Sequence, residues 1–325
     1  MSGGDWRPTA DANVMRHRAA MLARARAWFA SQQVLEVQTP LLSSAAVSDP
    51  AIESIAVVAG SGRRQFLQTS PEYPMKRLLA AGIGDCYQIC PVFRDGESGR
   101  LHSPEFTMIE WYRLRFGVEE LQRDVAGLLQ ATTAGLRLFA PARSITYREA
   151  IRQSCGLDIR SASVDNIAAT LAANGIRPVA TADWDIDAWL DLLMGAVVGP
   201  GLGFEAPVFV RDYPASQAAL ARLRADDDGT PVAERFELYV DGVELANGFH
   251  ELGDADEQRG RFERDLAERR SRGQPLNPLD ERLLAALAHG LPGCSGVALG
   301  FDRLVLVTLK LPGLASAMSF TDDRA

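Results

Sequence analysis

Two alternating segments joined by an arginine-rich turn constrain the fold of this chain most. "DCYQICPVFR", residues 85–94, alternates like a strand, and "FTMIEWYR", residues 106–113, does so again after the turn. Side chains two residues apart on a strand share a face. We therefore predict a hairpin whose return strand carries Phe106, Met108, Glu110 and Tyr112 on one face and Thr107, Ile109 and Trp111 on the other.

The composition is that of an ordinary globular protein. A chain of 325 residues with 47% hydrophobic and 23% charged residues can bury a large core, as one big domain or two small ones. Its formal net charge of -8 argues against charge-driven attachment to nucleic acid or an anionic membrane, although specific RNA contacts stay open. No apolar segment approaches the roughly 20 residues of a membrane-spanning helix, and no apolar signal-peptide core precedes the first helix. We expect a cytoplasmic protein that does not enter a membrane.

Cysteine usage indicates neither a disulfide framework nor a zinc site. The four cysteines are few for a chain of this length, and Cys86 and Cys90 have no second ligand pair in the sequence. Because free cysteine behaves as a small hydrophobic residue, we predict buried thiols.

The remaining segments predict a mixture of helices and strands without repeats or linkers. We expect a helix that is capped by Asn13 and ends near Gln33, a strand at 34–42, a mainly helical insertion at about 118–200 and a final strand that leads into a helix within "GCSGVALGFDRLVLVTLKL". The first helix should carry four arginines on its polar side, namely Arg16, Arg18, Arg24 and Arg26. We see no catalytic signal in the insertion, and we predict one catalytic domain over residues 1–325.

Several cationic side chains lie where a polyphosphate could bind. Arg94 ends a predicted strand, Arg100 and His102 lie in the turn, and Arg303 follows "ALGFD" at the start of a predicted helix. Guanidinium groups match phosphate oxygens, and a helix N-terminus adds backbone donors and a favourable dipole. Each arginine taken alone could equally be a solvated surface residue. The glycine-rich loops of parallel-sheet nucleotide folds are absent from the sequence.

Acidic residues suggest a metal site and a cation site. Glu237 and Glu244 flank "LYVDGV" and could hold Mg²⁺, which binds one or two carboxylates while keeping water and phosphate ligands. The same two residues could instead be exposed glutamates of a strand and a turn. Glu110 shares its strand face with Tyr112 and Phe106, so a bound cation beside a planar base would fit there. The alternative is a half-buried strand acid, and such an acid needs a partner.

Three ordered motifs in this chain resemble those of the class II aminoacyl-tRNA synthetases. "VLEVQTPLL" is similar to motif 1, "VFRDGESGRLHSPEFTMIEWYR" to motif 2 and "GVALGFDRLVLV" to motif 3, while "TSPEYPMKRLL" and "ERFELYVDGVELANGFHEL" resemble the lysyl branch. The resemblance covers nearly the whole chain. It implies an α+β class II catalytic fold, an antiparallel sheet flanked by helices, a homodimer formed through motif 1, and the use of ATP and Mg²⁺.

Two departures from the lysyl pattern narrow the expectation. The residues before Val34 leave no room for the anticodon-binding barrel of lysyl-tRNA synthetases, so we expect no binding of a tRNA anticodon. Ala298 stands between Gly296 and Gly300, where the lysyl pattern has another glycine, and its methyl group should disfavour an α-amino acid. Both features resemble those of a short paralogous branch of the family. Members of this branch activate (R)-β-lysine, and α-lysine less well, and ligate the activated amino acid to a lysine ε-amine of translation elongation factor P.

The resemblance also implies roles for individual residues. Arg94 and Arg303 would be the catalytic residues, and both would bind ATP together with Asp95, Gly96, Arg100, His102, Ser103, Phe106, Glu244, Leu245 and Gly300. The amino-acid donor would contact Ser70, Pro71, Glu72, Glu110, Tyr112, Asn247, Glu251 and Ala298, with Tyr112 and Glu251 on its terminal ammonium and Asn247 on its carboxylate. Glu237 and Glu244 would bind Mg²⁺.

Two positions in motif 2 differ from the family pattern. The glutamate that usually meets the adenine amino group is replaced by Gly96, and the acid is Glu97. Either the turn shifts by one residue or the backbone of Asp95 and Gly96 reads the adenine. Ser103 stands where asparagine is usual.

Two other kinds of protein remain open at this point. One is another ATP-dependent ligase on this scaffold, either a truncated synthetase that charges tRNA or an amide-forming enzyme that uses aspartate. Glu72, Glu110 and Glu251 favour a diamine donor over aspartate. The other is a non-catalytic regulatory paralogue, a kind of protein that typically lacks the phosphate-binding arginines.

Overall fold

The chain forms two compact units. The computed structural model describes residues 6–60, 62–179 and 184–325. Unit 1 comprises Met1–Leu138 and Glu251–Ala325, and unit 2 comprises Phe139–His250. The interpretation of 1–325 as one catalytic domain stays a prediction.

The predicted hairpin is present in unit 1 as β5 (Cys86–Phe93) and β6 (Glu105–Leu114). The two strands pair antiparallel along the whole length of β5, with Ile89 opposite Ile109. Within unit 1 the sheet order is β1 (Leu35–Glu36), β5, β6 and β12 (Cys294–Gly300). β1 runs parallel to β5, and β12 runs antiparallel to β6. The hairpin prediction is confirmed.

The two faces of β6 pack against different partners, as predicted from the alternation. Trp111 is fully buried and meets the ring of Phe29 edge-on, with 5.5 Å between ring centroids. Tyr112 packs instead with Met75 and Leu79. Because both faces are covered, the polar groups of Glu110 and Tyr112 are held inside the protein.

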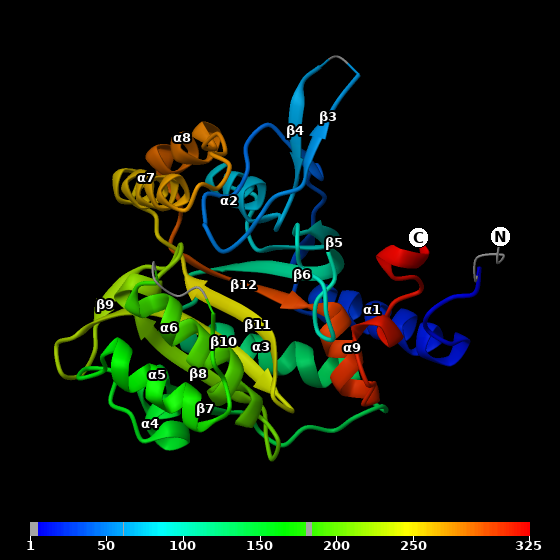
Figure 1. Ribbon diagram of the computed structural model, residues 1–325. Coiled ribbons are helices and arrows are strands. Elements are labelled where there is room, and N and C mark those ends of the chain that lie inside the picture. The colour runs from blue at the N-terminus through cyan, green and yellow to red at the C-terminus, as the bar shows by residue number, and fades with distance from the viewer. Residues whose placement is uncertain (1–5, 61, 180–183) are drawn as a thin grey trace, which may run out of the picture. The chain divides into compact units, whose positions relative to one another are not determined.

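Helices cover the sheet of unit 1. They are α1 (Ala12–Ser31), α2 (Glu72–Ala80), α3 (Val118–Thr133), α7 (Ala255–Ser271), α8 (Glu281–Gly290) and α9 (Phe301–Leu309). Figure 1 shows α7 and α8 beside α2, and α9 directly after β12. A smaller sheet consists of β2 (Leu42–Ser43), β4 (Arg64–Leu67) and β3 (Ala56–Val58) in that order.

Three details of the first 45 residues differ from the sequence predictions. Asp11, not Asn13, caps α1, because its Oδ1 accepts the backbone N–H groups of Asn13 and Val14, both at 2.8 Å. The predicted strand at 34–42 is wrong as a continuous strand. Within this segment only two short pieces are strands: β1 pairs with β5, and β2 pairs with β4. Pro40, which has no N–H to donate, lies between the two pieces.

Arg18 is the third difference, since it points inward from the predicted polar side of α1. Its guanidinium forms an ion pair with the buried carboxylate of Asp302 and donates to Thr107 Oγ1 at 2.8 Å. The charge needs this partner because Asp302 is only 2% exposed.

Unit 2 combines an antiparallel sheet with a helical layer. Its strands are β7 (Arg143–Thr146), β8 (Val208–Pro214), β9 (Leu223–Ala225), β10 (Pro231–Val240) and β11 (Val243–His250). The order within the unit is β11, β10, β8, β7, with β9 also on β10, and among the described strands of unit 2 only β7 and β8 pair in parallel.

The helices of unit 2 are α4 (Tyr147–Cys155), α5 (Val164–Ala173) and α6 (Ile186–Leu193), which continues into a π-helical turn at Met194–Val198. Tyr147, Leu190 and Val210 belong to one buried apolar cluster of helices and strands. In Figure 1 these helices lie alongside β7 and β8. Residues 118–200 thus contain α3 to α6 and β7, apart from 180–183, which lie outside the described residues.

The predicted α+β class with an antiparallel-dominated sheet is confirmed. Cys86, Cys90 and Cys294 are buried free thiols as predicted, but Cys155 is only half-buried. Among the described residues, no helix combines the length and the apolar composition that crossing a membrane requires.

Candidate active site

The carboxyl group of Glu110 lies at the centre of a buried polar cluster in unit 1. Ser70 Oγ donates to its Oε2 at 2.6 Å, and the hydroxyl of Tyr112 donates to its Oε1 at 2.7 Å. Ser70 Oγ also accepts the backbone N–H of Glu72 at 3.0 Å, which joins the start of α2 to β6. Burial and then the charge of Glu72 raise the pKa of Glu110 to about 7. This carboxyl group therefore changes charge near neutral pH.

A lysine that the sequence analysis missed connects two of the predicted donor-binding acids. Lys76 lies one helical turn after Glu72, and its Nζ is 2.7 Å from Glu72 Oε1 and 2.5 Å from Glu251 Oε2. Burial, which is only partly offset by the charge of Lys76, raises the pKa of Glu251 to about 8. The spacing "EYPMK" places Lys76 on the same side of α2 as Glu72, which was the signal available in the sequence.

Gly296 has no side chain, and Tyr112 and Glu251 fill the space where one would lie. It lies directly opposite Tyr112 in the β6–β12 ladder, so the two share a sheet face. A Cβ atom at position 296 would be 2.3 Å from Tyr112 Cε1 and 2.5 Å from Glu251 Oε1. Ala298 lies opposite Glu110 in the same way. The predicted donor residues of unit 1 thus converge on one face of β6 and β12, next to the start of α2.

Three of the predicted phosphate-binding cations lie near one another in unit 1. Partial burial and then the guanidinium of Arg303 lower the pKa of His102, and Arg94 acts in the same direction. The guanidinium carbon of Arg94 is 5.2 Å from the centroid of the Phe106 ring. Arg94 Nε is buried and has no hydrogen-bond partner among the described residues. A ligand with phosphate oxygens would provide one.

The position of Arg303 is fixed by the anchored start of α9. Asp302 accepts the backbone N–H of Thr107 at 2.6 Å and pairs with Arg18. Arg303 Nε then donates to the carbonyl oxygen of Leu101 at 3.1 Å. Gly300 is the N-cap of α9 and offers no side-chain cap, so it leaves the backbone N–H groups of the first turn available to an anion.

The turn after β5 shows where the acid of motif 2 lies. Glu97 pairs with Arg94 at 3.4 Å, and Gly96 adopts a left-handed conformation with φ of 74°. Asp95 Oδ1 accepts the backbone N–H of Gly96 at 2.9 Å. Ser103 is buried, whereas Arg100 is exposed. The contact of the adenine with Asp95 and Gly96 stays a prediction.

In unit 2, a β-bulge brings three of the four predicted ligands, all but Leu245, to one face of the β10–β11 hairpin. Glu237 lies opposite Asn247 and Tyr239 opposite Glu244, while Leu245 is left without a partner across the ladder. Because directly opposite residues share a face, this shift returns Glu244 to the face of Glu237 and Asn247. Without the bulge, Glu244 would point to the opposite face.

A half-buried arginine orients Asn247. Arg235 Nε lies 3.2 Å from Asn247 Oδ1, and its NH2 donates to Glu237 Oε1 at 2.7 Å. Arginine is only a donor, so the amide oxygen of Asn247 must face it. The Asn247 Nδ2 group then faces away from Arg235 and can donate to an anionic group such as a carboxylate.

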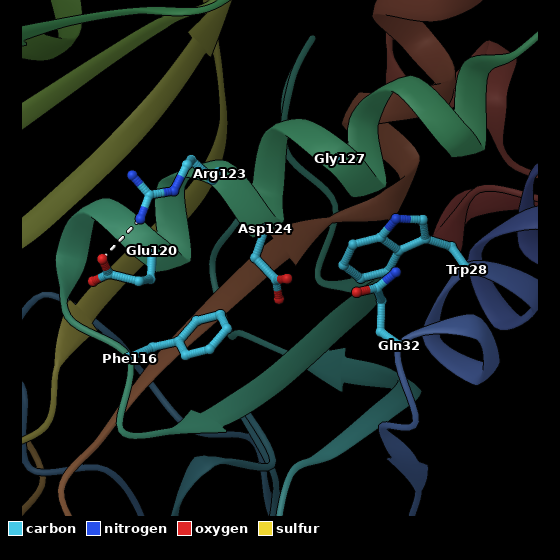
Figure 2. Close-up of a pocket in the computed structure, with 7 residues that line it drawn as sticks. All are labelled: Trp28, Gln32, Phe116, Glu120, Arg123, Asp124 and Gly127. Carbon is cyan, nitrogen blue, oxygen red and sulfur yellow. Dashed lines mark hydrogen bonds and ion pairs between the residues drawn. The ribbon is translucent and has the colours of Figure 1, made fainter.

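A separate cavity of about 410 Å³ lies on the other side of β6 in unit 1. Figure 2 shows its lining from α1, α3 and the residue Phe116 between β6 and α3. Asp124 faces this cavity and accepts the indole N–H of Trp111 at 3.0 Å. Since Trp111 points away from the face of Glu110 and Tyr112, this cavity is separate from the buried polar cluster around Glu110.

The family of this chain follows from its motifs, its fold and a direct comparison. The model of the tRNA synthetases class II (D, K and N) matches residues 5–324. The chain belongs to this family.

Similar curated proteins share one name. The elongation factor P–(R)-β-lysine ligases of Salmonella paratyphi B (strain ATCC BAA-1250 / SPB7) and Salmonella schwarzengrund (strain CVM19633) are each 46% identical to this chain over 325 residues. The protein of that name from Salmonella dublin is 45% identical. In each case the match covers 98% of this chain and 98% of the relative.

Proposed function

We propose that this protein is an ATP-dependent ligase that activates (R)-β-lysine, and α-lysine less well, as an aminoacyl-adenylate and transfers it to a lysine ε-amine of elongation factor P. The observation that carries the proposal is the cluster of Glu72, Glu110 and Glu251 on one side of the β6–β12 pair. Acidic side chains suit a donor with two ammonium groups, whereas aspartate as a donor would require basic side chains. The name shared by the full-length relatives supports the same acceptor.

The chemistry requires positioning and charge stabilisation rather than an enzyme nucleophile. The donor's carboxylate oxygen attacks the α-phosphorus of ATP, and the bond to the bridging oxygen breaks as pyrophosphate leaves. Arg94 and Arg303 bind the phosphates and stabilise the negative charge that develops on them. The acceptor's neutral ε-amine then attacks the adenylate carbonyl, AMP leaves, and the amide nitrogen loses a proton.

The face formed by β10 and β11 fits a magnesium ion. It holds Glu237 and Glu244, and both oxygens of Glu237 retain lone pairs beyond those that Arg235 and Tyr239 use. Two carboxylates are typical of Mg²⁺ held together with a nucleotide, and the described residues contain no cluster of three or more metal-binding side chains. Bound there, Mg²⁺ would supply positive charge to the phosphates.

The remaining assignments belong to the same proposal. Ser70, Pro71, Glu72 and Glu110 surround the backbone-side amine of the donor, Tyr112 and Glu251 bind its terminal ammonium, and Asn247 binds its carboxylate. Phe106 and Arg303 enclose the adenine. We also propose a cytoplasmic homodimer formed through residues 34–42, without binding of a tRNA anticodon.

ATP–pyrophosphate exchange tests the proposed function directly. Purified protein is assayed with (R)-β-lysine, α-lysine, aspartate and no amino acid. We expect exchange that favours (R)-β-lysine over α-lysine, because the methyl group of Ala298 lies opposite Glu110 where an α-amine would bind. Exchange with α-lysine alone would indicate another lysyl acceptor, and no exchange with any donor would support a regulatory paralogue.

Donor binding should strengthen as the pH rises from 6 to 8.5. The pKa values of Glu110 and Glu251, about 7 and about 8, mean that both carboxyl groups of the empty site are protonated at the low end and ionised at the high end. Only the ionised forms attract an ammonium group, so the donor KM should fall by about tenfold or more over this range. Exchange rates at varied donor concentration measure this KM.

The matched control is Glu251→Gln, which cannot titrate at position 251. In this variant the donor KM should be higher at pH 8.5 and should lose the part of the pH dependence near pH 8. A donor KM that is constant or rises between pH 6 and 8.5 in the unmodified protein would contradict the assignment of Glu110 and Glu251 to donor ammonium groups.

A further inference from the structure

Lysine is rare in this chain, and one of its two lysines is buried. Only Lys76 and Lys310 occur among the 34 lysine and arginine residues. Lys310 is exposed at the end of α9, whereas the Lys76 side chain is 1% exposed within α2. Lysine carries a compact charge on a flexible stem, and arginine carries a wide planar fork. Position 76 thus has the smaller cation in a closely packed place.

The ammonium group of Lys76 is held between two acids from distant parts of the sequence. Glu72 belongs to the same helix, and Glu251 follows β11 and lies beside Gly296 of β12. Although burial opposes its charge, the carboxylates of Glu251 and Glu72 raise the pKa of Lys76 above its ordinary value. Lys76 is therefore a permanent internal cation.

Glu251 has one oxygen in this contact and one oxygen without a protein partner. Lys76 contacts Oε2, while the buried Oε1 makes no hydrogen bond to any residue that the structure describes. Oε1 packs against Gly296 next to the ring of Tyr112. An unpartnered oxygen in a side chain that is 1% exposed needs a donor, and a ligand's ammonium group can supply one.

We propose that Lys76 is a positioning residue that holds Oε2 of Glu251, favours the ionised form of this carboxyl group and leaves Oε1 for the terminal ammonium of the donor, which makes the site selective for an amino acid with a cationic end. The inference deepens the proposed function and rests on it. Without Lys76, Glu251 would share the buried space with Glu72 and Glu110 and no protein cation. Both of the influences that oppose protonation of Glu251 come from Lys76.

The test compares two amino acids of equal length that differ in the terminal charge. (R)-β-lysine carries a terminal ammonium group, and (R)-3-aminoheptanoate has a methyl group in its place. ATP–pyrophosphate exchange gives kcat and KM for each with the unmodified protein, Lys76→Met and Lys76→Gln. Met matches the length of the lysine stem, and Gln keeps a hydrogen-bond donor without the charge. Lys310→Met is the control at the other lysine.

We expect Lys76→Met to lower the preference for (R)-β-lysine over (R)-3-aminoheptanoate by about tenfold or more, mainly through a higher KM for (R)-β-lysine. The KM for ATP should be unchanged, and Lys310→Met should behave like the unmodified protein. Lys76→Gln should show the same loss of preference, because its amide can contact Glu251 but cannot favour ionisation. Thermal unfolding of each variant separates this effect from a loss of folded protein.

Two results would overturn the inference. An unchanged preference in folded Lys76→Met or Lys76→Gln would reduce Lys76 to a packing role, and a lower KM for (R)-β-lysine would make it a competitor of the donor. If the unmodified protein shows no exchange with (R)-β-lysine, the proposed function itself fails. That outcome differs from a failure of the inference about Lys76, because it is measured on the unmodified protein alone.

Discussion

Replacing Arg303 by alanine should abolish measurable ATP–pyrophosphate exchange while the protein remains folded. Arg303 lies in the first turn of α9, next to His102 and beyond the N-cap Gly300, where the backbone donors of the helix and the guanidinium can act on the same phosphate. Loss of one preorganised donor to a transition state lowers kcat by about 100- to 1,000-fold. Loss of a guanidinium that contacts the departing phosphates should lower kcat at least as much.

Folding should tolerate the change because Asp302, not Arg303, anchors α9 to Thr107 and Arg18. The control is Arg123→Ala, which removes an exposed arginine of α3 whose ion pair with Glu120 lies on the surface. Circular dichroism and thermal unfolding report the folded state, and exchange reports adenylate formation. An Arg303→Ala protein that is folded and retains normal exchange would refute its role on the phosphates.

Gly296→Ala should raise the donor KM strongly and leave the KM for ATP nearly unchanged. The new methyl group would lie within 2.6 Å of two atoms of the Tyr112 ring and of Glu251 Oε1. Neither side chain has exposed space into which it can move, since Tyr112 is 2% and Glu251 5% exposed. Overpacking of this kind costs about 1–3 kcal/mol, and we expect the donor KM to rise by about 5- to 150-fold.

The matched control is Gly293→Ala, three residues earlier, where a Cβ atom would have no neighbour within 4 Å. This variant should keep the donor KM and the thermal stability of the unmodified protein. If Gly296→Ala raised the KM values for donor and ATP equally, the change would have disturbed the unit as a whole. The assignment of the donor ammonium to Tyr112 and Glu251 would then lose its support.

The sequence was sufficient for the features that depend on neighbours along the chain. Alternation predicted the β5–β6 hairpin and the shared face of Glu110 and Tyr112, since side-chain direction repeats every two residues. The final strand and helix, now β12 and α9, followed from the spacing of glycines and apolar residues. The family motifs then indicated the class of fold and the cluster of candidate residues.

The features that depend on contacts between distant segments could not be predicted in this way. Lys76 looked like any cation within a short helix, because only the folded chain brings Glu251 to it. Arg18 was placed on the polar side of its helix, although Asp302 draws it inward. The alternation of "RFELYVDGVELANGF" also gave no sign of a bulge, because the ladder of the partner strand defines which residue is unpaired.

The unpaired Leu245 limits how this part of the protein can vary in length. Deleting Leu245 would restore a regular ladder and leave the Glu244 carboxylate on the side of Glu237, because Glu244 and Asn247 would then be two residues apart. Deleting both residues between Glu244 and Asn247 would instead make these two residues neighbours, which point to opposite sides of a strand. In natural relatives that keep both acids, this segment should therefore either have the length found here, with the bulge, or be one residue shorter, without it.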